Sequence, residues 1–145
     1  MSIVEDIKQA WSWVGIEPIK VVAENDFGNL IIEDRTGKYW RLCPEEVHCK
    51  VVADDETALR DLFQDEEFLM DWSMDRLVQL AQDKLGPLKP GYKYYLVYPA
   101  ILGGAYDLSN INTVSLTELI RFSGDVGEQI KDLPDGAQVQ IKIVD

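Results

Sequence analysis

The stretch from Tyr92 to Asp107, YKYYLVYPAILGGAYD, constrains the fold more than any other part of the chain. Tyr92–Tyr98 is rich in aromatic and β-branched residues, and in an extended segment its tyrosines fall on both faces. This pattern predicts a central strand. Pro99 has no backbone N–H and ends such a strand, while Gly103 and Gly104 permit a positive φ or the close approach of another backbone. We therefore predict a structural turn at these three residues. The two glycines lack the spacing and the following Lys-Ser/Thr of a phosphate-binding loop.

The size and composition of the chain indicate one folded domain. A chain of 145 residues buries roughly 68–70% of its unfolded surface on folding. Hydrophobic residues make up 46% of the sequence and charged residues 28%, as in ordinary globular proteins. No repeat, low-complexity tract or linker divides the chain, so we treat residues 1–145 as a single domain.

The charge balance argues against nucleic acid as a partner. The sequence has 26 acidic and 14 basic residues, a net charge of −12. Proteins that hold phosphate backbones carry a basic stripe, whereas a strongly acidic chain is either kept soluble by its charge or matched to a basic partner. Both interpretations of the acidity remain open from composition alone.

The candidate catalytic and metal-binding residues are few. His48 is the sole histidine, and it lies between the two cysteines, Cys43 and Cys49. Zinc requires three or four ligands, and this spacing matches no common finger. His48 also lacks an identifiable nucleophile to activate. We therefore expect reduced thiols, no metal, no cofactor and no enzymatic activity.

The beginning of the chain, MSIVEDIKQAW, carries acidic residues and no basic leader with an apolar core. No run approaches the roughly 18 apolar residues of a membrane span. We expect a cytoplasmic protein without membrane contact.

Periodicity and turn residues predict an α+β fold, a mainly antiparallel β-sheet packed against several α-helices. The expected elements are a helix from Ser2 to Gly15, a strand or connector at Ile19–Val22, a hairpin of Leu30–Glu33 with Lys38–Leu42, a strand at Val47–Val52, helices at Asp54–Phe63, Asp65–Trp72 and Met74–Leu85, a short strand at Ile111–Val114, a helix from Ser115 to about Asp132 with an irregularity near Gly124, a turn at Pro134–Gly136 and a last strand at Val139–Ile143. Ser73 is a candidate cap for the helix that begins at Met74.

One segment concentrates negative charge. Between Asp54 and Asp75 the only basic residue is Arg60. The acidic residues there are Asp54, Asp55, Glu56, Asp61, Asp65, Glu66, Glu67, Asp71 and Asp75. They form either a solvated face or a docking surface for a basic protein, on which charge would speed encounter.

Three segments resemble a known family. They are FGNLIIEDRTGKYWRL (Phe27–Leu42), DKLGPLKPGYKYYLVYPAILGGAYDLSNI (Asp83–Ile111) and EQIKDLPDGAQVQIK (Glu128–Lys142). This order is similar to the C-terminal domain of the immunity proteins that bacteria make against DNase effectors of the type VI secretion system. The resemblance runs from about Val21 to the end, and residues 1–20 add an N-terminal helix. Longer members carry an additional N-terminal domain, which this chain does not match.

The resemblance implies a protein that binds a cognate toxin, a basic nuclease, and blocks it stoichiometrically without any chemistry of its own. We expect a monomer. From charge and turn position we predict that the partner-binding residues are Asp54, Asp55, Asp65, Glu66, Glu67, Asp71, Tyr106 and Asp107. The alternative is a regulatory module that binds a small ligand between sheet and helices near Tyr92–Tyr106.

Overall fold

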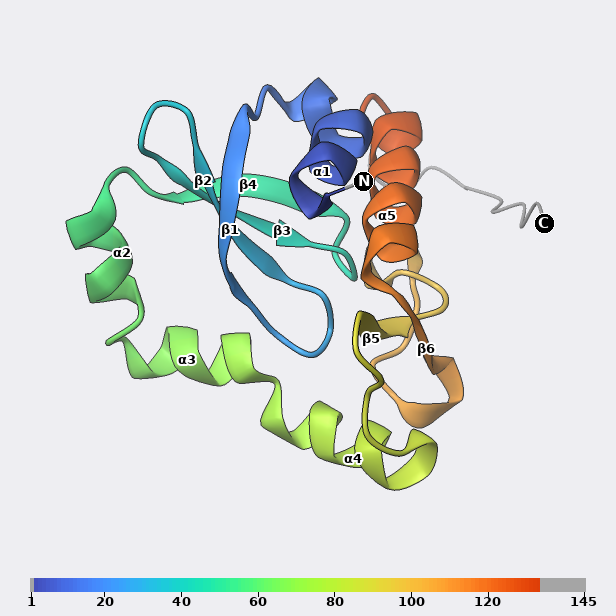
Figure 1. Cartoon of the computed structure of the whole chain (residues 1–145). Coiled ribbons are helices and arrows are strands. Elements are labelled where there is room, and N and C mark those ends of the chain that lie inside the picture. The colour runs from blue at the N-terminus through green and yellow to red at the C-terminus, as the bar shows by residue number, and fades with distance from the viewer. Residues whose placement is uncertain (1, 134–145) are drawn as a thin grey trace.

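Four antiparallel strands form the main sheet in the computed structural model, which describes residues 2–133 (Figure 1). The strands lie in the order β1 (Pro18–Glu24), β2 (Leu30–Asp34), β3 (Tyr39–Cys43) and β4 (His48–Ala53). The β2–β3 turn is closed by Asp34, whose Oδ1 accepts hydrogen bonds from the backbone N–H of Thr36 and of Lys38 at 2.8 and 3.0 Å. This confirms the predicted hairpin.

The helices begin at polar caps that the sequence makes visible. Helix α1 (Ile3–Trp11), α2 (Glu56–Leu62), α3 (Glu66–Ser73), α4 (Asp75–Leu85) and α5 (Leu116–Ile130) account for most of the helical residues. Ser2, Asp55, Asp65 and Ser115 accept backbone N–H groups at the starts of α1, α2, α3 and α5. Ser73 does not cap α4, because α3 extends through it; Met74, at φ 50°, makes the break between the two helices.

Strand β2 is buried on both faces of the sheet. Leu30 and Ile32 pack with α1 and α5 in one apolar cluster, which includes Trp11 and Ile120. Ile31 points to the opposite face and packs with α2 and α3 around Trp72. Helices α2, α3 and α4 follow one another in an arc around the sheet, on the side away from α1 and α5 (Figure 1).

The tyrosine-rich segment forms a strand, β5 (Tyr92–Leu96), but it is not a central one. It pairs only with β6 (Ile111–Ser115), in a separate two-stranded antiparallel sheet. Tyr94 packs against α4, while Tyr95 faces Leu119 and Phe122 of α5. The aromatic residues on both faces therefore reflect coverage by two helices, and the prediction of a central strand was wrong.

Helix α5 is continuous through Gly124, contrary to the predicted irregularity. A Cβ at Gly124 would lie 2.5 Å from the carbonyl oxygen of Ala10, so α1 and α5 approach each other closely at this glycine. Asp6 of α1, fully buried, accepts hydrogen bonds from Thr117 and Arg121 of α5 at 2.9 and 3.2 Å. At the second glycine of α5, Gly127, a Cβ would lie 2.7 Å from the Trp13 ring and 3.1 Å from Val47 Cγ1, so both glycines make room for neighbouring segments.

The arrangement is a single α+β domain built on antiparallel pairing, as the sequence predicts. The predicted turn at Pro134–Gly136 and the predicted strand at Val139–Ile143 lie outside the described residues. Within residues 2–133, no helix has the length and apolar character needed to cross a membrane.

Candidate functional site

The predicted turn at Pro99 is present, and its two glycines have different roles. Pro99 precedes a 3-10 helix, η2 (Ala100–Leu102), which ends at Gly103 with φ 96°. Gly104 has no positive φ, but a Cβ there would lie 1.7 Å from the carbonyl oxygen of Tyr98. Gly103 thus supplies the left-handed turn and Gly104 the close backbone approach. After this turn Tyr106 reaches Glu46, between β3 and β4.

A groove of about 1010 Å³ lies between this loop and the junction of α3 with α4. Its lining residues are Met70, Asp71, Ser73, Met74, Asp75, Arg76, Leu77, Leu80, Tyr106, Asp107, Leu108 and Ser109. We call it the α3–α4 groove. A smaller cleft of about 250 Å³ adjoins it and shares Asp71, Met74 and Tyr106 with it. Three of the predicted partner-binding residues, Asp71, Tyr106 and Asp107, are therefore brought together here.

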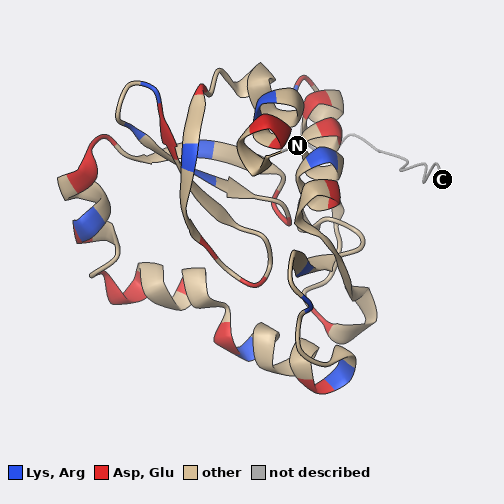
Figure 2. Cartoon of the chain, viewed as in Figure 1, with Lys and Arg blue, Asp and Glu red and all other residues tan. Residues whose placement is uncertain are grey.

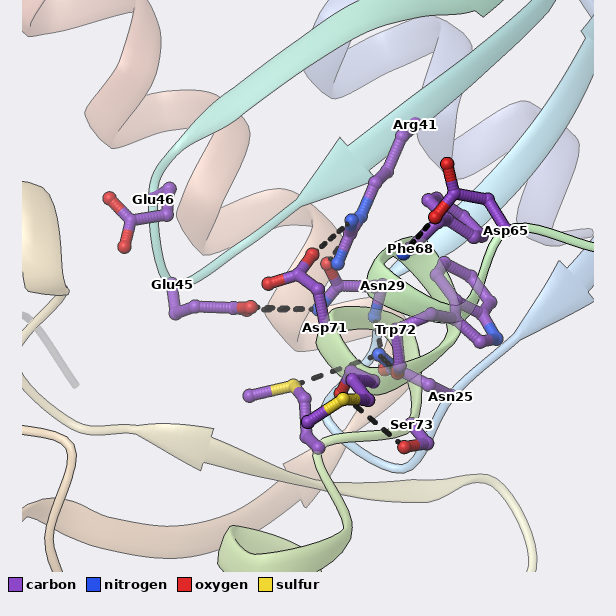
Figure 3. Close-up of polar contacts among 12 residues, drawn as sticks. Asn25, Asn29, Arg41, Glu45, Glu46, Asp65, Phe68, Asp71, Trp72 and Ser73 are labelled. Carbon is purple, nitrogen blue, oxygen red and sulfur yellow. Dashed lines mark hydrogen bonds and ion pairs between the residues drawn. The ribbon is translucent and has the colours of Figure 1, made fainter. Parts of the chain in front are cut away.

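Arg41 fixes the position of α3 beside this groove (Figure 3). Its Nη1 donates to Asp71 Oδ2 at 2.6 Å, and its Nε donates to Asn29 Oδ1 at 3.1 Å. The guanidinium carbon lies 5.2 Å from the centroid of the Trp72 ring and 5.8 Å from that of Phe68. Strand β3 thereby holds α3 through charge, hydrogen bonding and ring contact at one point.

Glu45 is a buried carboxylate at the base of the smaller cleft. Asn29 Nδ2 donates to both of its oxygens at 3.0 Å, as Figure 3 shows. Burial raises the pKa of Glu45, and the hydrogen bonds from Asn29 oppose that effect only in part. The backbone oxygen of Glu45 also accepts from Ala100 N at 2.8 Å. Glu45 thus connects the β3–β4 turn to the loop that carries Tyr106.

Tyr106 lies at the surface, not in the core. Its side chain is 45% exposed, and its hydroxyl donates a hydrogen bond to Glu46. Burial of the inner part of the ring, together with that hydrogen bond, raises the pKa of Tyr106. Asp107 accepts a hydrogen bond from Ser109 N at 2.9 Å and caps the 3-10 helix η3 (Leu108–Asn110). The loop therefore offers a partly exposed ring whose neutral hydroxyl lies near the carboxylates of Glu46 and Glu45.

The remaining predicted residues lie away from the groove, along α2 and α3. Asp55 and Asp65 cap these helices through Ala58 N at 2.8 Å and Glu67 N at 2.9 Å. Asp54, Glu66 and Glu67 are exposed, and their side chains make no ion pair within residues 2–133. Acidic residues recur along α2, α3 and α4 and outnumber the basic ones there (Figure 2). We call this surface the acidic arc.

Sequence reasoning missed Arg41, Glu45 and Glu46. The pair Glu45-Glu46 follows a proline between two strands, where charged residues are ordinarily solvated, and no local pattern marks Glu45 as buried. Arg41 is one residue within a predicted strand, and nothing in its immediate sequence sets it apart. Its contacts with Asn29 and Asp71 depend on how β2 and α3 pack against β3.

A second cavity, of about 290 Å³, lies between the two-stranded sheet and α5. It is lined by Tyr95, Val97, Tyr98, Val114, Glu118, Leu119 and Phe122. This is the region where the sequence suggested a small-ligand pocket, and the cavity is mainly apolar with one carboxylate, that of Glu118.

The candidate nucleophiles are not activated. Burial raises the pKa of Cys49 to about 12 and that of Cys43 further, so both thiols are uncharged at neutral pH. Burial is the main cause that lowers the pKa of His48, and the positive charges of Lys50 and Arg41 lower it further. In the part of the chain that the structure describes, no three His, Cys, Asp or Glu side chains are placed to hold a metal ion.

Comparison with known proteins gives one family. No curated protein matches the chain. A family model described as "T6SS immunity protein Tdi1, C-terminal" matches residues 53–127, where T6SS denotes the type VI secretion system. The match is narrower than the resemblance expected from Val21 to the end, but it includes the acidic arc, the turn at Pro99 and both walls of the α3–α4 groove. Since it covers just over half of the residues, the chain belongs to this family of type VI secretion immunity proteins.

Proposed function

We propose that this protein neutralises a nuclease toxin by binding to it one to one in the cytoplasm and covering the basic surface with which the toxin holds DNA. The observation that carries the proposal is the acidic arc. Its exposed acidic residues lie on and just before three successive helices inside the segment that matches the immunity family (Figure 2).

Electrostatics gives the proposal a mechanism. A nuclease must present a basic surface to the phosphate backbone, and an acidic protein can compete for that surface. Asp54, Glu66 and Glu67 are suited to the encounter because no cation within residues 2–133 neutralises them. Charges of this kind raise the association rate and are screened by salt. The role requires no catalytic group.

The test is a titration of the cognate toxin's DNA cleavage with the purified chain. Inhibition is expected to reach completion at one molar equivalent. The association rate, measured by stopped flow with a catalytically disabled toxin, is expected to fall steeply between low and physiological salt. Inhibition that needs a large excess, or cleavage unaffected at any ratio, would contradict the proposal.

A charge-matched pair of variants separates the acidic arc from net charge. One variant carries Asp54→Asn, Glu66→Gln and Glu67→Gln. The control carries Asp125→Asn and Glu128→Gln in the last part of α5 and Asp132→Asn just after it. Both lose the same three charges, so long-range attraction falls equally. The first is expected to slow association more than the second, and equal slowing would show that the arc has no special part in it.

The second candidate function is binding of a small organic molecule in the cavity beside Tyr95 and Phe122. Its volume of about 290 Å³ and its mainly apolar lining suit such a ligand. A ligand present at about 100 times its dissociation constant stabilises a fold by about 2.7 kcal/mol, which a thermal melt resolves. A melting shift with a metabolite pool that Phe122→Trp abolishes would support this function; melts unchanged across the pools would reject it.

A further inference from the structure

We propose that the α3–α4 groove is the point at which the toxin docks, and that its occupant is a basic segment of the toxin that places an apolar side chain against the exposed apolar residues of the groove and lysine or arginine residues beside its carboxylates. This inference rests on the proposed function and names the site and chemistry of the contact, as distinct from the acidic arc, which governs encounter.

The groove is lined in part by exposed apolar side chains. Met70 is 77% exposed, and Leu80 is 36% exposed on the next helix. Both line the groove with Tyr106, whose ring is 45% exposed. Exposed methionine and tyrosine are typical of protein-binding surfaces, since methionine adapts to different shapes and tyrosine combines a large ring with a polar end.

The rim of the groove is mainly negative. Asp75 is exposed, and within residues 2–133 no cation pairs with it. Asp71 and Asp107 line the same groove, and Glu46 lies beside Tyr106. These four carboxylates face two cations, Arg76 in the groove and Arg41, which pairs with Asp71 from the adjoining cleft. This balance attracts a basic segment and repels phosphate backbones, anionic lipid and a second copy of this acidic chain.

The walls of the groove are held in place before any partner arrives. Arg41 anchors α3 through Asp71, with 2.6 Å between Nη1 and Oδ2. Lys84 Nζ donates to the Leu108 carbonyl at 2.9 Å and ties α4 to the loop. Because both walls are fixed, binding does not have to pay for ordering them. The groove is thus an assembled receptor for an amphipathic basic segment.

The test uses four single variants of the full chain, in two matched pairs. Met70→Glu puts a charge on the apolar lining of the groove, and its control is Ile19→Glu, at a residue of β1 that is 51% exposed. Asp75→Lys reverses a rim charge, and its control is Glu128→Lys on α5, which changes net charge equally. Circular dichroism verifies that each variant is folded.

Dissociation constants are measured with the catalytically disabled toxin. Met70→Glu is expected to raise the dissociation constant about tenfold or more, chiefly through faster dissociation, because a buried apolar contact is lost. Asp75→Lys is expected to raise it at least several-fold more than Glu128→Lys, and Ile19→Glu is expected to change it little.

The outcomes separate the two proposals. If all four variants and the natural chain bind and inhibit alike, the groove proposal is overturned while the immunity function stands. If the natural chain neither binds nor inhibits the toxin, the proposed function itself fails. A dimer of the free chain that Met70→Glu dissociates would instead assign the groove to a second copy.

The occupant is identified by a photocrosslink. p-Benzoylphenylalanine introduced in place of Met70 is irradiated in the complex, and the joined toxin peptide is sequenced. A peptide that contains lysine or arginine beside an apolar residue is expected. An acidic peptide, or no crosslink from a complex that forms with natural affinity, would overturn the assignment.

Discussion

Arg41 Nη1 lies 2.6 Å from Asp71 Oδ2, and this contact joins the third strand of the sheet to the helix that borders the α3–α4 groove. The two ends differ in environment, with the Arg41 side chain 12% exposed and that of Asp71 70% exposed. The contact therefore places an exposed carboxylate by means of a largely buried cation, and it sets where the acidic arc meets the groove.

Replacing this cation is expected to destabilise the fold. Arg41→Met would leave Asn29 Oδ1 without its donor and remove the contact with the Trp72 ring, a loss of about 2–3 kcal/mol in the free energy of unfolding. Urea denaturation measures it. The control is Arg60→Met, whose ion pair with Glu56 joins two exposed side chains and is expected to contribute little. Equal losses for the two variants would contradict the anchoring role of Arg41.

The contact between α1 and α5 is expected to exclude any side chain at Gly124. A Cβ there would meet the Ala10 carbonyl at 2.5 Å and the Ala10 Cβ at 2.7 Å. Gly124→Ala should therefore lower stability by about 1–3 kcal/mol despite the better helix propensity of alanine. The neighbouring exposed change Asp125→Ala serves as control in thermal melts. A Gly124→Ala variant as stable as the natural chain would show that the helices separate easily.

The buried carboxylate of Glu45 predicts a particular pH dependence. Its pKa in the folded protein is raised by burial above the ordinary 4.5, so the folded state binds the proton more tightly than the unfolded state does. Its contribution to stability is therefore most favourable at low pH and is lost as pH rises through the folded pKa.

Glu45→Gln keeps an acceptor for Asn29 and removes the charge. The variant is expected to be more stable than the natural chain at pH 7.5, with the difference shrinking as the pH falls toward 4.5. Denaturation of both proteins across this range measures it. A difference that is constant with pH, or that grows on acidification, would contradict the raised pKa.

The hydrogen bond from Tyr106 to Glu46 is expected to couple these residues in toxin binding. Tyr106→Phe and Glu46→Gln each disturb the same contact, so each should weaken binding and the double variant should lose less than the sum of the two. A double-mutant cycle of dissociation constants measures the coupling, expected to be about 1 kcal/mol. Additive losses would mean that Tyr106 acts independently of Glu46.

Local sequence signals predicted the elements and several of their ends. Ser2, Asp55 and Asp65 mark helix starts because their side chains accept nearby backbone N–H groups within the same turn. The turn residues of the Asp34–Lys38 hairpin act in the same way. At Pro99–Gly104 the sequence indicated both possible uses of the glycines, and the structure shows one use at each.

Packing between distant segments decided the rest. The sequence of β5 carries aromatic residues on both faces, but only the tertiary structure shows that two helices cover them, in place of flanking strands. It also divides the predicted partner-binding residues into those at the α3–α4 groove and those along α2 and α3. Asp71 and Tyr106 belong to the groove because Arg41 holds the first and Glu46 holds the second, and each of these partners is far away in sequence. Hydrogen bonds within one turn depend on a few adjacent residues and can be read from the sequence. The groove, the burial of Glu45 and the anchoring of α3 depend on contacts between residues 12 to 60 positions apart, which exist only once the chain has folded.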